Sequence, residues 1–325
     1  MVAGIARFAV QNIGDYQQIP VSTWVYPQNK DDGFLDFSNA GNIMEFFVDL
    51  IGPYPFKKLA NVQSKTRFGG MENAGNIFYF EKSVTGKQER EALIAHEIAH
   101  QWFGNSASEA DWPHVWLSEG FATYFTNLYM LDSKGTEAFK ERVDRERQAV
   151  LNYYTKSKTP VIDTKTTNYM RLLNTNSYQK GGWVLHMLRK QVGHDNFIKG
   201  IRAYYDRYKY SNATTEDFKK VMAAVSGQNL DTFFHQWLYR AGQPVLKTDW
   251  IYADGKVRMI VDQMQEELFE FLLDLEFVMK DGSTEIKTID VKHKSAPFVI
   301  EASGDVKEVN LDPDSWLLFE TYKEN

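Results

Sequence analysis

The chain contains no cysteine among its 325 residues. Disulfide frameworks, thiolate metal sites and cysteine nucleophiles are therefore all excluded. Any metal ion must be held by histidine and carboxylate side chains. The absence does not assign a compartment, because both reducing and oxidising compartments contain cysteine-free proteins.

An excess of basic charge and long apolar runs are also missing. The formal net charge of −6 gives no basic field that would indicate nucleic acid or an anionic membrane surface as a partner. No stretch approaches about 18 uninterrupted apolar residues, so we expect no membrane span. The first residues lack the charged start and the long apolar run of a signal peptide. The compartment, cytoplasmic or extracytoplasmic, stays open.

Apolar residues make up 43% of the chain and aromatic residues 14%, enough for large cores in two domains. The hydrophobic pattern predicts an α+β protein, mostly helical in its middle, followed by a small β-sandwich. The boundary of the sandwich is expected near residues 241–245. The expected elements are strands within 1–30, a helix over 36–50, strands over 62–68 and 76–80, helices over 87–240, and short strands over 245–322.

Residues 96–102 read HEIAHQW. On a helix, the four-residue spacing stacks His96 and His100 on one face, one turn apart, where they can share one metal ion. Glu97 points to a neighbouring angle that suits a metal-bound water. Because the motif fixes only three residues, two ordinary core or surface histidines remain the alternative on this evidence alone.

A second segment, WLSEGFATYF, supplies a candidate third ligand in Glu119, which is separated from His100 by eighteen residues. A catalytic zinc site needs three protein ligands and one open position. Glu119 has aromatic neighbours, which a solvated charge would not favour. Gly120, next to it, would let two helices approach closely. The two segments together favour a metal site over the alternative.

Three motifs in order carry a family resemblance. HEIAHQWFGN followed by DWPHVWLSEGFATYF resembles the gluzincin zinc aminopeptidases, the family of aminopeptidase N and the leukotriene hydrolase. GGMEN (69–73) resembles the exopeptidase motif of that family, and SYQKGGWVLHML (177–188) resembles its segment with the catalytic tyrosine. The resemblance covers about residues 20–240. It implies a thermolysin-like catalytic domain.

The resemblance implies a role for each matching residue. One Zn²⁺ per chain would be held by His96, His100 and Glu119, with one position left for water. Glu97 would be the general base that activates the water. Tyr178 would donate to the oxyanion, although by its residue pattern alone it would more readily be a packing side chain.

GGMEN would bind the substrate. Gly69 and Gly70 free the backbone to approach an extended peptide closely. Glu72 would hold the free α-ammonium group of the peptide, which makes the site an exopeptidase. Met71 and Asn73 would shape the loop and the first specificity pocket. From composition alone, a glycine bulge with an exposed glutamate is an equal interpretation.

The resemblance also implies what this chain lacks. Members of the family begin with a large N-terminal β-domain, of which residues 1–20 would be a remnant. Residues 21–242 would be the catalytic domain and residues 243–325 the β-sandwich. The shortened chain would show lower activity, and it could self-associate through surface that the missing domain covers in the family.

Three functions remain on this evidence. The first is an aminopeptidase that acts on peptides with a free N-terminus. The second is a broader zinc hydrolase, either an endopeptidase or an epoxide hydrolase. The third is a zinc-binding fragment or scaffold without turnover. We interpret His186 as an ordinary helical residue and the run KERVDRERQ (140–148) as a solvated helix face.

Overall fold

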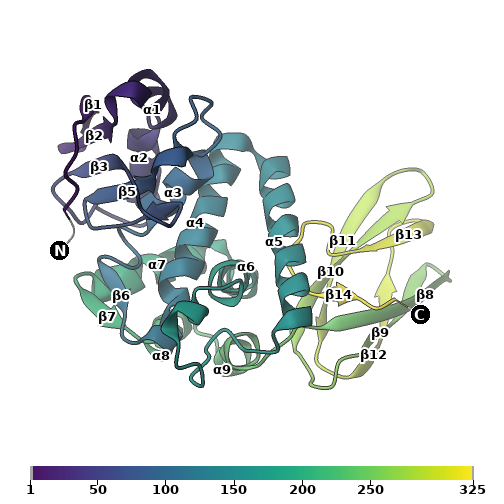
Figure 1. Ribbon diagram of the computed structural model, residues 1–325. Coiled ribbons are helices and arrows are strands. Elements are labelled where there is room, and N and C mark those ends of the chain that lie inside the picture. The colour runs from purple at the N-terminus through teal and green to yellow at the C-terminus, as the bar shows by residue number, and fades with distance from the viewer. Residues whose placement is uncertain (1–2, 324–325) are drawn as a thin grey trace.

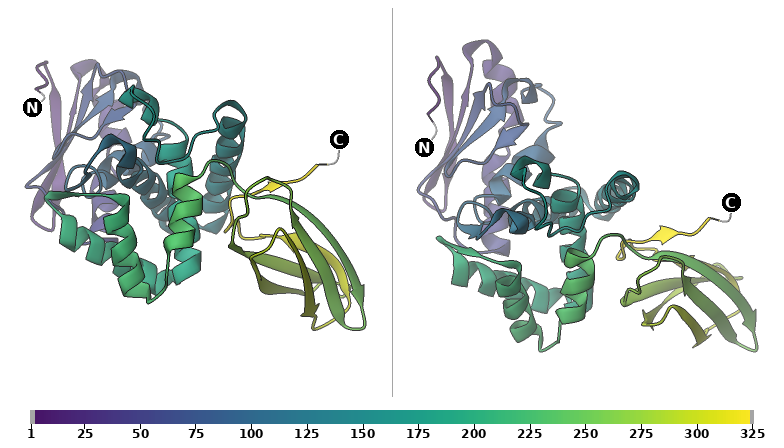
Figure 2. Two further views of the ribbon diagram at one scale, coloured as in Figure 1. Left: turned by 90° about the horizontal axis from the view of Figure 1, so that it is seen from below. Right: turned by 60° about the horizontal axis from the view of Figure 1, so that its bottom comes forward.

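The computed structural model describes residues 3–323. It contains a mixed five-stranded sheet, a helical region and a C-terminal β-sandwich. The five-stranded sheet and the sandwich lie at opposite ends of the molecule, with the helices between them (Figures 1 and 2). The predicted α+β class, helical with a following β-sandwich, is confirmed.

The five-stranded sheet carries GGMEN at one edge. Its strand order is β1-β2-β3-β5-β4, with β2, β3 and β5 parallel and the two outer strands antiparallel to their neighbours. The short edge strand β4 is therefore paired on one side only. The strands are β1 (Ala9–Tyr16), β2 (Ile19–Val25), β3 (Leu59–Ser64), β4 (Gly70–Met71) and β5 (Asn76–Phe80).

The start of the first helix differs from the prediction. Strands were expected up to residue 30 and one helix over 36–50, but α1 (Lys30–Asp36) precedes α2 (Ala40–Leu50). The helix α1 ends at Asp36, and α2 begins only at Ala40. Asp36 is buried, and its carboxylate accepts hydrogen bonds from the backbone amides of Gly86 and Gln88. A local helical pattern does not reveal such a long-range anchor.

The helical region begins with α3, the helix of HEIAHQW, and centres on α4 (Figure 1). No helix within residues 3–323 is both long and apolar enough to cross a membrane. The helices are α3 (Glu91–Ala99), α4 (Trp116–Lys134), α5 (Thr136–Lys156), α6 (Gly181–Val192), α7 (His194–Tyr208), α8 (Thr215–Ser226) and α9 (Asp231–Phe234). Two short parallel strands, β6 (Ala107–Glu109) and β7 (Ser211–Ala213), lie among them. The remaining short helices are η1 (Pro27–Asn29), η2 (Glu81–Ser83), η3 (Trp112–His114), η4 (Tyr169–Leu172), η5 (Asn176–Lys180) and η6 (His235–Tyr239).

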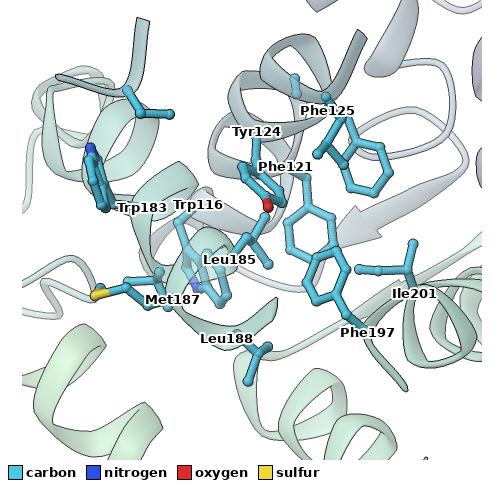
Figure 3. Close-up of a cluster of buried hydrophobic side chains, with 14 of the residues drawn as sticks. Trp116, Phe121, Tyr124, Phe125, Trp183, Leu185, Met187, Leu188, Phe197 and Ile201 are labelled. Carbon is cyan, nitrogen blue, oxygen red and sulfur yellow. The ribbon is translucent and has the colours of Figure 1, made fainter. Parts of the chain in front are cut away.

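Helix α4 is the centre of the core. Its residues from Trp116 to Tyr129 are all buried. Tyr124 packs against Phe197 of α7 and His186 of α6, and Figure 3 shows Tyr124 in the same buried cluster as Phe197 and Leu185. A Cβ on Gly120 would lie 2.9 Å from the backbone of Gly181. The close helix approach expected at Gly120 is therefore present, and α6 is its partner.

The C-terminal β-sandwich consists of two sheets that face each other, and their strands pair antiparallel except for β14 with β8. One has the order β12-β9-β8-β14 and the other β11-β10-β13. Their facing side chains, such as Leu246, Val261, Leu273 and Leu275, are fully buried. The strands are β8 (Val245–Ala253), β9 (Lys256–Gln263), β10 (Phe271–Met279), β11 (Thr284–Val291), β12 (Ser295–Glu301), β13 (Val306–Leu311) and β14 (Glu320–Thr321). Strand β14 pairs parallel to β8.

Polar contacts attach the sandwich to α5 and α6. The His186 ring stacks on Trp316 at a centroid distance of 4.4 Å, and its Nε2 donates to the Ser315 carbonyl. Arg147 pairs with Asp312 at 2.7 Å. His186 therefore lies at the interface between α6 and the sandwich, and its interpretation as an ordinary helical residue is wrong. The solvated helix face predicted for residues 140–148 is wrong at Arg147, which pairs with the sandwich.

The predicted domain limits, 1–20, 21–242 and 243–325, stay predictions. Strands β1 and β2 pair with each other on either side of residues 17–18. The first strand of the sandwich begins at Val245.

The contact at Gly120 predicts a specific loss of stability. In Gly120→Ala, the new methyl group would meet the backbone of Gly181 at 2.9 Å and the Ser177 carbonyl at 3.1 Å. Overpacking of this kind costs about 1–3 kcal/mol of unfolding free energy, which urea unfolding would measure. In the control Gly304→Ala, the nearest atom lies at 3.6 Å, so stability should stay the same. Equal stability of the two variants would contradict the packing argument.

His186 predicts a dependence of stability on pH. Burial lowers the pKa of His186 to about 3, whereas the unfolded side chain takes up a proton below about pH 6.5. The unfolded state then binds more protons, so this contribution is complete above about pH 6.5 and is lost as the pH falls. His186→Gln should be less stable near neutral pH and lose less stability on acidification. Parallel stability curves for variant and wild type would contradict this expectation.

Candidate metal centre and active site

Helices α3 and α4 bring three possible metal ligands together. The Nε2 atoms of His96 and His100 lie 3.0 Å apart. Oε2 of Glu119 lies 3.4 Å from Nε2 of His96 and 3.2 Å from Nε2 of His100. Ligand atoms around a tetrahedral zinc ion are about 3.3 Å apart, since each bond is about 2.0–2.1 Å long. This group could hold a metal ion.

The local fold fixes the orientation of these ligands. Ile94 and Ile98 of α3 are buried in the hydrophobic core, whereas His96 and His100 line the cavity. Nδ1 of His100 lies 3.1 Å from the Phe103 carbonyl and 3.1 Å from Oγ of Ser118. A proton on Nδ1, donated to that carbonyl, leaves Nε2 free to bind a metal ion.

The electrostatics around His96, His100 and Glu119 favour the binding of a cation. Burial would raise the pKa of Glu119, but His100 and His96 hold it well below its usual range. Burial would lower the pKa of His100, but Glu119 and Glu72 raise it to about 10. Oε2 of Glu119 is buried and faces the two imidazole nitrogens at 3.4 and 3.2 Å. A buried carboxylate oxygen that converges with two imidazole nitrogens fits a metal ligand.

Glu97 lies between the metal group and the edge strand β4. The residue is 4% exposed, and burial raises its pKa to about 8. Gly70 lies directly against it, because a Cβ at this glycine would approach the Glu97 carboxyl group to 2.2 Å. A larger residue at position 70 would therefore displace the carboxyl group.

The GGMEN loop is tied to the end of the histidine helix. Gln101, the residue after His100, donates to the Glu72 carbonyl at 2.8 Å and accepts from the Gly75 amide at 2.8 Å. Asn105 also donates to the Glu72 carbonyl. Sequence reasoning missed both anchoring residues. Their positions beside HExxH in HEIAHQWFGN were the available signal.

Most of the predicted site residues line one cavity of about 350 Å³. Asn73 is the exception: it lines a separate hollow that the segment of residues 3–8 borders, and its amide donates to the Met71 carbonyl. The predicted residues that line the cavity are Gly69, Gly70, Met71, Glu72, His96, Glu97, His100, Glu119 and Tyr178. Those not predicted are Phe68, Leu93, Glu109, Trp112, Val115, Ser118 and Leu173.

Tyr178 lies in the π-helical turn η5, just before α6. Its ring is nearly parallel to the His96 ring, at a centroid distance of 6.0 Å. Burial raises the pKa of Tyr178, and the nearby Glu119 carboxylate raises it further. The phenol is therefore protonated and can act as a hydrogen-bond donor in the cavity.

Known proteins are similar to this chain in sequence and in fold. An alanine/arginine aminopeptidase of Saccharomyces cerevisiae is 29% identical over 87% of this chain and 35% of its own length. Probable aminopeptidase 2 of Sulfurisphaera tokodaii is 28% identical over 98% of this chain and 45% of its own length. The crystal structure of Legionella pneumophila aminopeptidase A in complex with aspartic acid has a TM-score of 0.82 at 15% identity, covering 98% of this chain and 38% of that chain.

This chain thus spans about a third to under a half of the length of these relatives. The model of the peptidase family M1 domain matches residues 36–237, which include both histidines, Glu119, GGMEN and Tyr178. The chain belongs to peptidase family M1.

Proposed function

We propose that this chain is a zinc-dependent aminopeptidase, which hydrolyses the first peptide bond of peptides with a free N-terminus. The observation that carries the proposal is the shared cavity: Glu72, Glu97 and Tyr178 line it together with the three-residue metal group. Several relatives are named aminopeptidases, which supports the same activity.

The proposed cofactor is one Zn²⁺ at His96, His100 and Glu119. Two imidazole nitrogens and one carboxylate oxygen are a donor set of catalytic zinc sites, and they leave a fourth position open. When bound, the ion would supply Lewis-acid activation of the scissile carbonyl and of a water molecule.

In the proposed reaction, Glu97 accepts a proton from the attacking water and delivers it to the leaving amine. Its buried carboxyl group has one oxygen without a hydrogen-bond partner in the described chain, so it is free for this exchange. Tyr178 donates its phenol proton in a hydrogen bond to the oxyanion that develops on the carbonyl oxygen. Its ring, stacked beside His96, supports this role.

Glu72 would make the site an exopeptidase. Its carbonyl accepts hydrogen bonds from Gln101 and Asn105, which hold the backbone of a residue that lines the cavity. A carboxylate there would bind the α-ammonium group of the substrate by charge-assisted hydrogen bonds. The edge strand β4 leaves one side unpaired, where an extended peptide could add by main-chain hydrogen bonds.

The role of Glu97 predicts a separation between metal binding and turnover. Glu97→Gln keeps the side-chain volume but removes the proton acceptor, so kcat should fall by about 10²–10⁴-fold. Zinc content, measured by plasma mass spectrometry, should remain at one ion per chain. Loss of the metal would identify Glu97 as a ligand instead. Glu89→Gln, at an exposed position, is the matched control and should retain both.

The role of Glu72 predicts a preference for free over blocked amino termini. Aminoacyl coumarin amides should be cleaved, their N-acetylated forms should not, and a chelator should stop the reaction. In Glu72→Gln, KM for the free substrates should rise and the ratio of free to blocked cleavage should fall. Ready cleavage of blocked substrates would favour an endopeptidase. No turnover from the folded, zinc-loaded chain would favour a scaffold.

A further inference from the structure

Three buried carboxylate oxygens have no hydrogen-bond partner among residues 3–323. They are Oε2 of Glu97, Oε2 of Glu109 and Oε2 of Glu119. All three residues line the same 350 Å³ cavity. Two of them have roles in the proposed function, as general base and metal ligand, and Glu109 has none.

Other buried carboxylates of this protein do have partners. Glu146 accepts from Nδ2 of Asn127 at 2.8 Å, and Glu91 pairs with Lys134 at 2.8 Å. The carboxyl group of Glu109 accepts a hydrogen bond from its own backbone amide, but its buried Oε2 has no partner among the described residues. A buried carboxylate oxygen without a partner is costly, and in this respect Oε2 of Glu109 resembles Oε2 of Glu97, which has a role in the proposed function.

The backbone holds Glu109 in place at the cavity. The residue ends β6, which follows the histidine helix directly and pairs in parallel with β7. The next amide, of Ala110, donates to the Ala213 carbonyl at 2.9 Å. Because the strand is fixed on both sides of Glu109, its carboxyl group belongs to the wall of the cavity.

The lining of the cavity suits a cationic group. Four glutamates line it, Glu72, Glu97, Glu109 and Glu119, and no lysine or arginine of the described chain does. Among these four, Glu109 is the carboxylate to which the proposed function assigns neither the metal ion, nor the substrate ammonium group, nor the attacking water. A positively charged substrate group beside Glu109 would therefore meet a carboxylate and no competing basic side chain of the described cavity lining.

We propose that Glu109 binds a positively charged side chain of the substrate, so that the site prefers peptides with lysine or arginine next to the scissile bond. This inference rests on the proposed aminopeptidase function and names its substrate class. A carboxylate selects a guanidinium or ammonium group by charge-assisted hydrogen bonds, which an uncharged side chain of the same size does not provide.

The test compares arginine with citrulline, which has nearly the same shape and no charge. For the zinc-loaded chain, kcat/KM for arginyl coumarin amide should exceed that for the citrullyl amide by about tenfold, equal to about 1.4 kcal/mol. The dipeptide amides Ala-Arg and Ala-citrulline place the same pair after the scissile bond and show which side Glu109 serves. A preference in either pair supports the proposal, and equal rates in both pairs overturn it.

The variant Glu109→Gln should lower kcat/KM for the arginyl amide to the level of the citrullyl amide, and zinc content should stay at one ion per chain. Glu89→Gln removes one negative charge at an exposed position, as Glu109→Gln does inside the cavity. This control variant should keep the preference for arginine over citrulline. A Glu109→Gln variant that retains the preference, or that loses both substrates equally, overturns the proposal. Loss of both would indicate a structural role.

A second measurement separates this inference from the proposed function. Calorimetry of arginine amide and citrulline amide binding to the zinc-loaded chain gives the same comparison without turnover. If the chain cleaves none of the substrates yet binds arginine amide about tenfold more tightly than citrulline amide, the proposed function fails and the inference stands. If it cleaves leucyl amide but shows no preference for arginine, the inference fails and the proposed function stands.

Discussion

The contact of a buried carboxylate, Glu119, with two imidazoles is the interaction on which the rest of this structure depends. Burial of an unpaired charge costs several kcal/mol, so the protein must hold its partners at a fixed distance. Helix α4 is buried from Trp116 to Tyr129, and α6 approaches it at Gly120 without intervening side chains. The rigid core therefore supports a charged site, and the turn η5, just before α6, brings Tyr178 to it.

The same constraint explains the opposite wall of the cavity. Gly70 approaches Glu97 so closely that no side chain fits between them, and Gln101 joins the GGMEN loop to the histidine helix. A shift of the helix would thus move the metal group and the Glu72 loop together. Coupling of this kind keeps catalytic groups in mutual register. It also concentrates four carboxylates in one small cavity, which favours the binding of cations.

The parts of the site that lie within one segment could be predicted from the sequence. The helical period puts His96 and His100 on one face, and the same period identifies Ile94 and Ile98 as core residues. The helix approach at Gly120 also follows from its segment, but its partner Gly181 does not, because it belongs to another helix. For the same reason the anchors Gln101 and Asn105, the unpaired Glu109, the interface contact of His186 and the start of α1 at Lys30 were not found. Each of these depends on a contact between distant segments, which no local pattern records. The roles of Tyr178 and Glu72 came from family resemblance rather than from such patterns.

The proposed chemistry requires that His96, His100 and Glu119 hold one metal ion with a position left open. Anomalous diffraction at the zinc edge, from crystals of the zinc-loaded chain, measures this directly. We expect one anomalous peak within about 2.0–2.2 Å of Nε2 of His96, Nε2 of His100 and Oε2 of Glu119, with no fourth protein ligand. A peak bound by Glu97 or Glu109 in place of Glu119, or no peak at the two histidines, would contradict it.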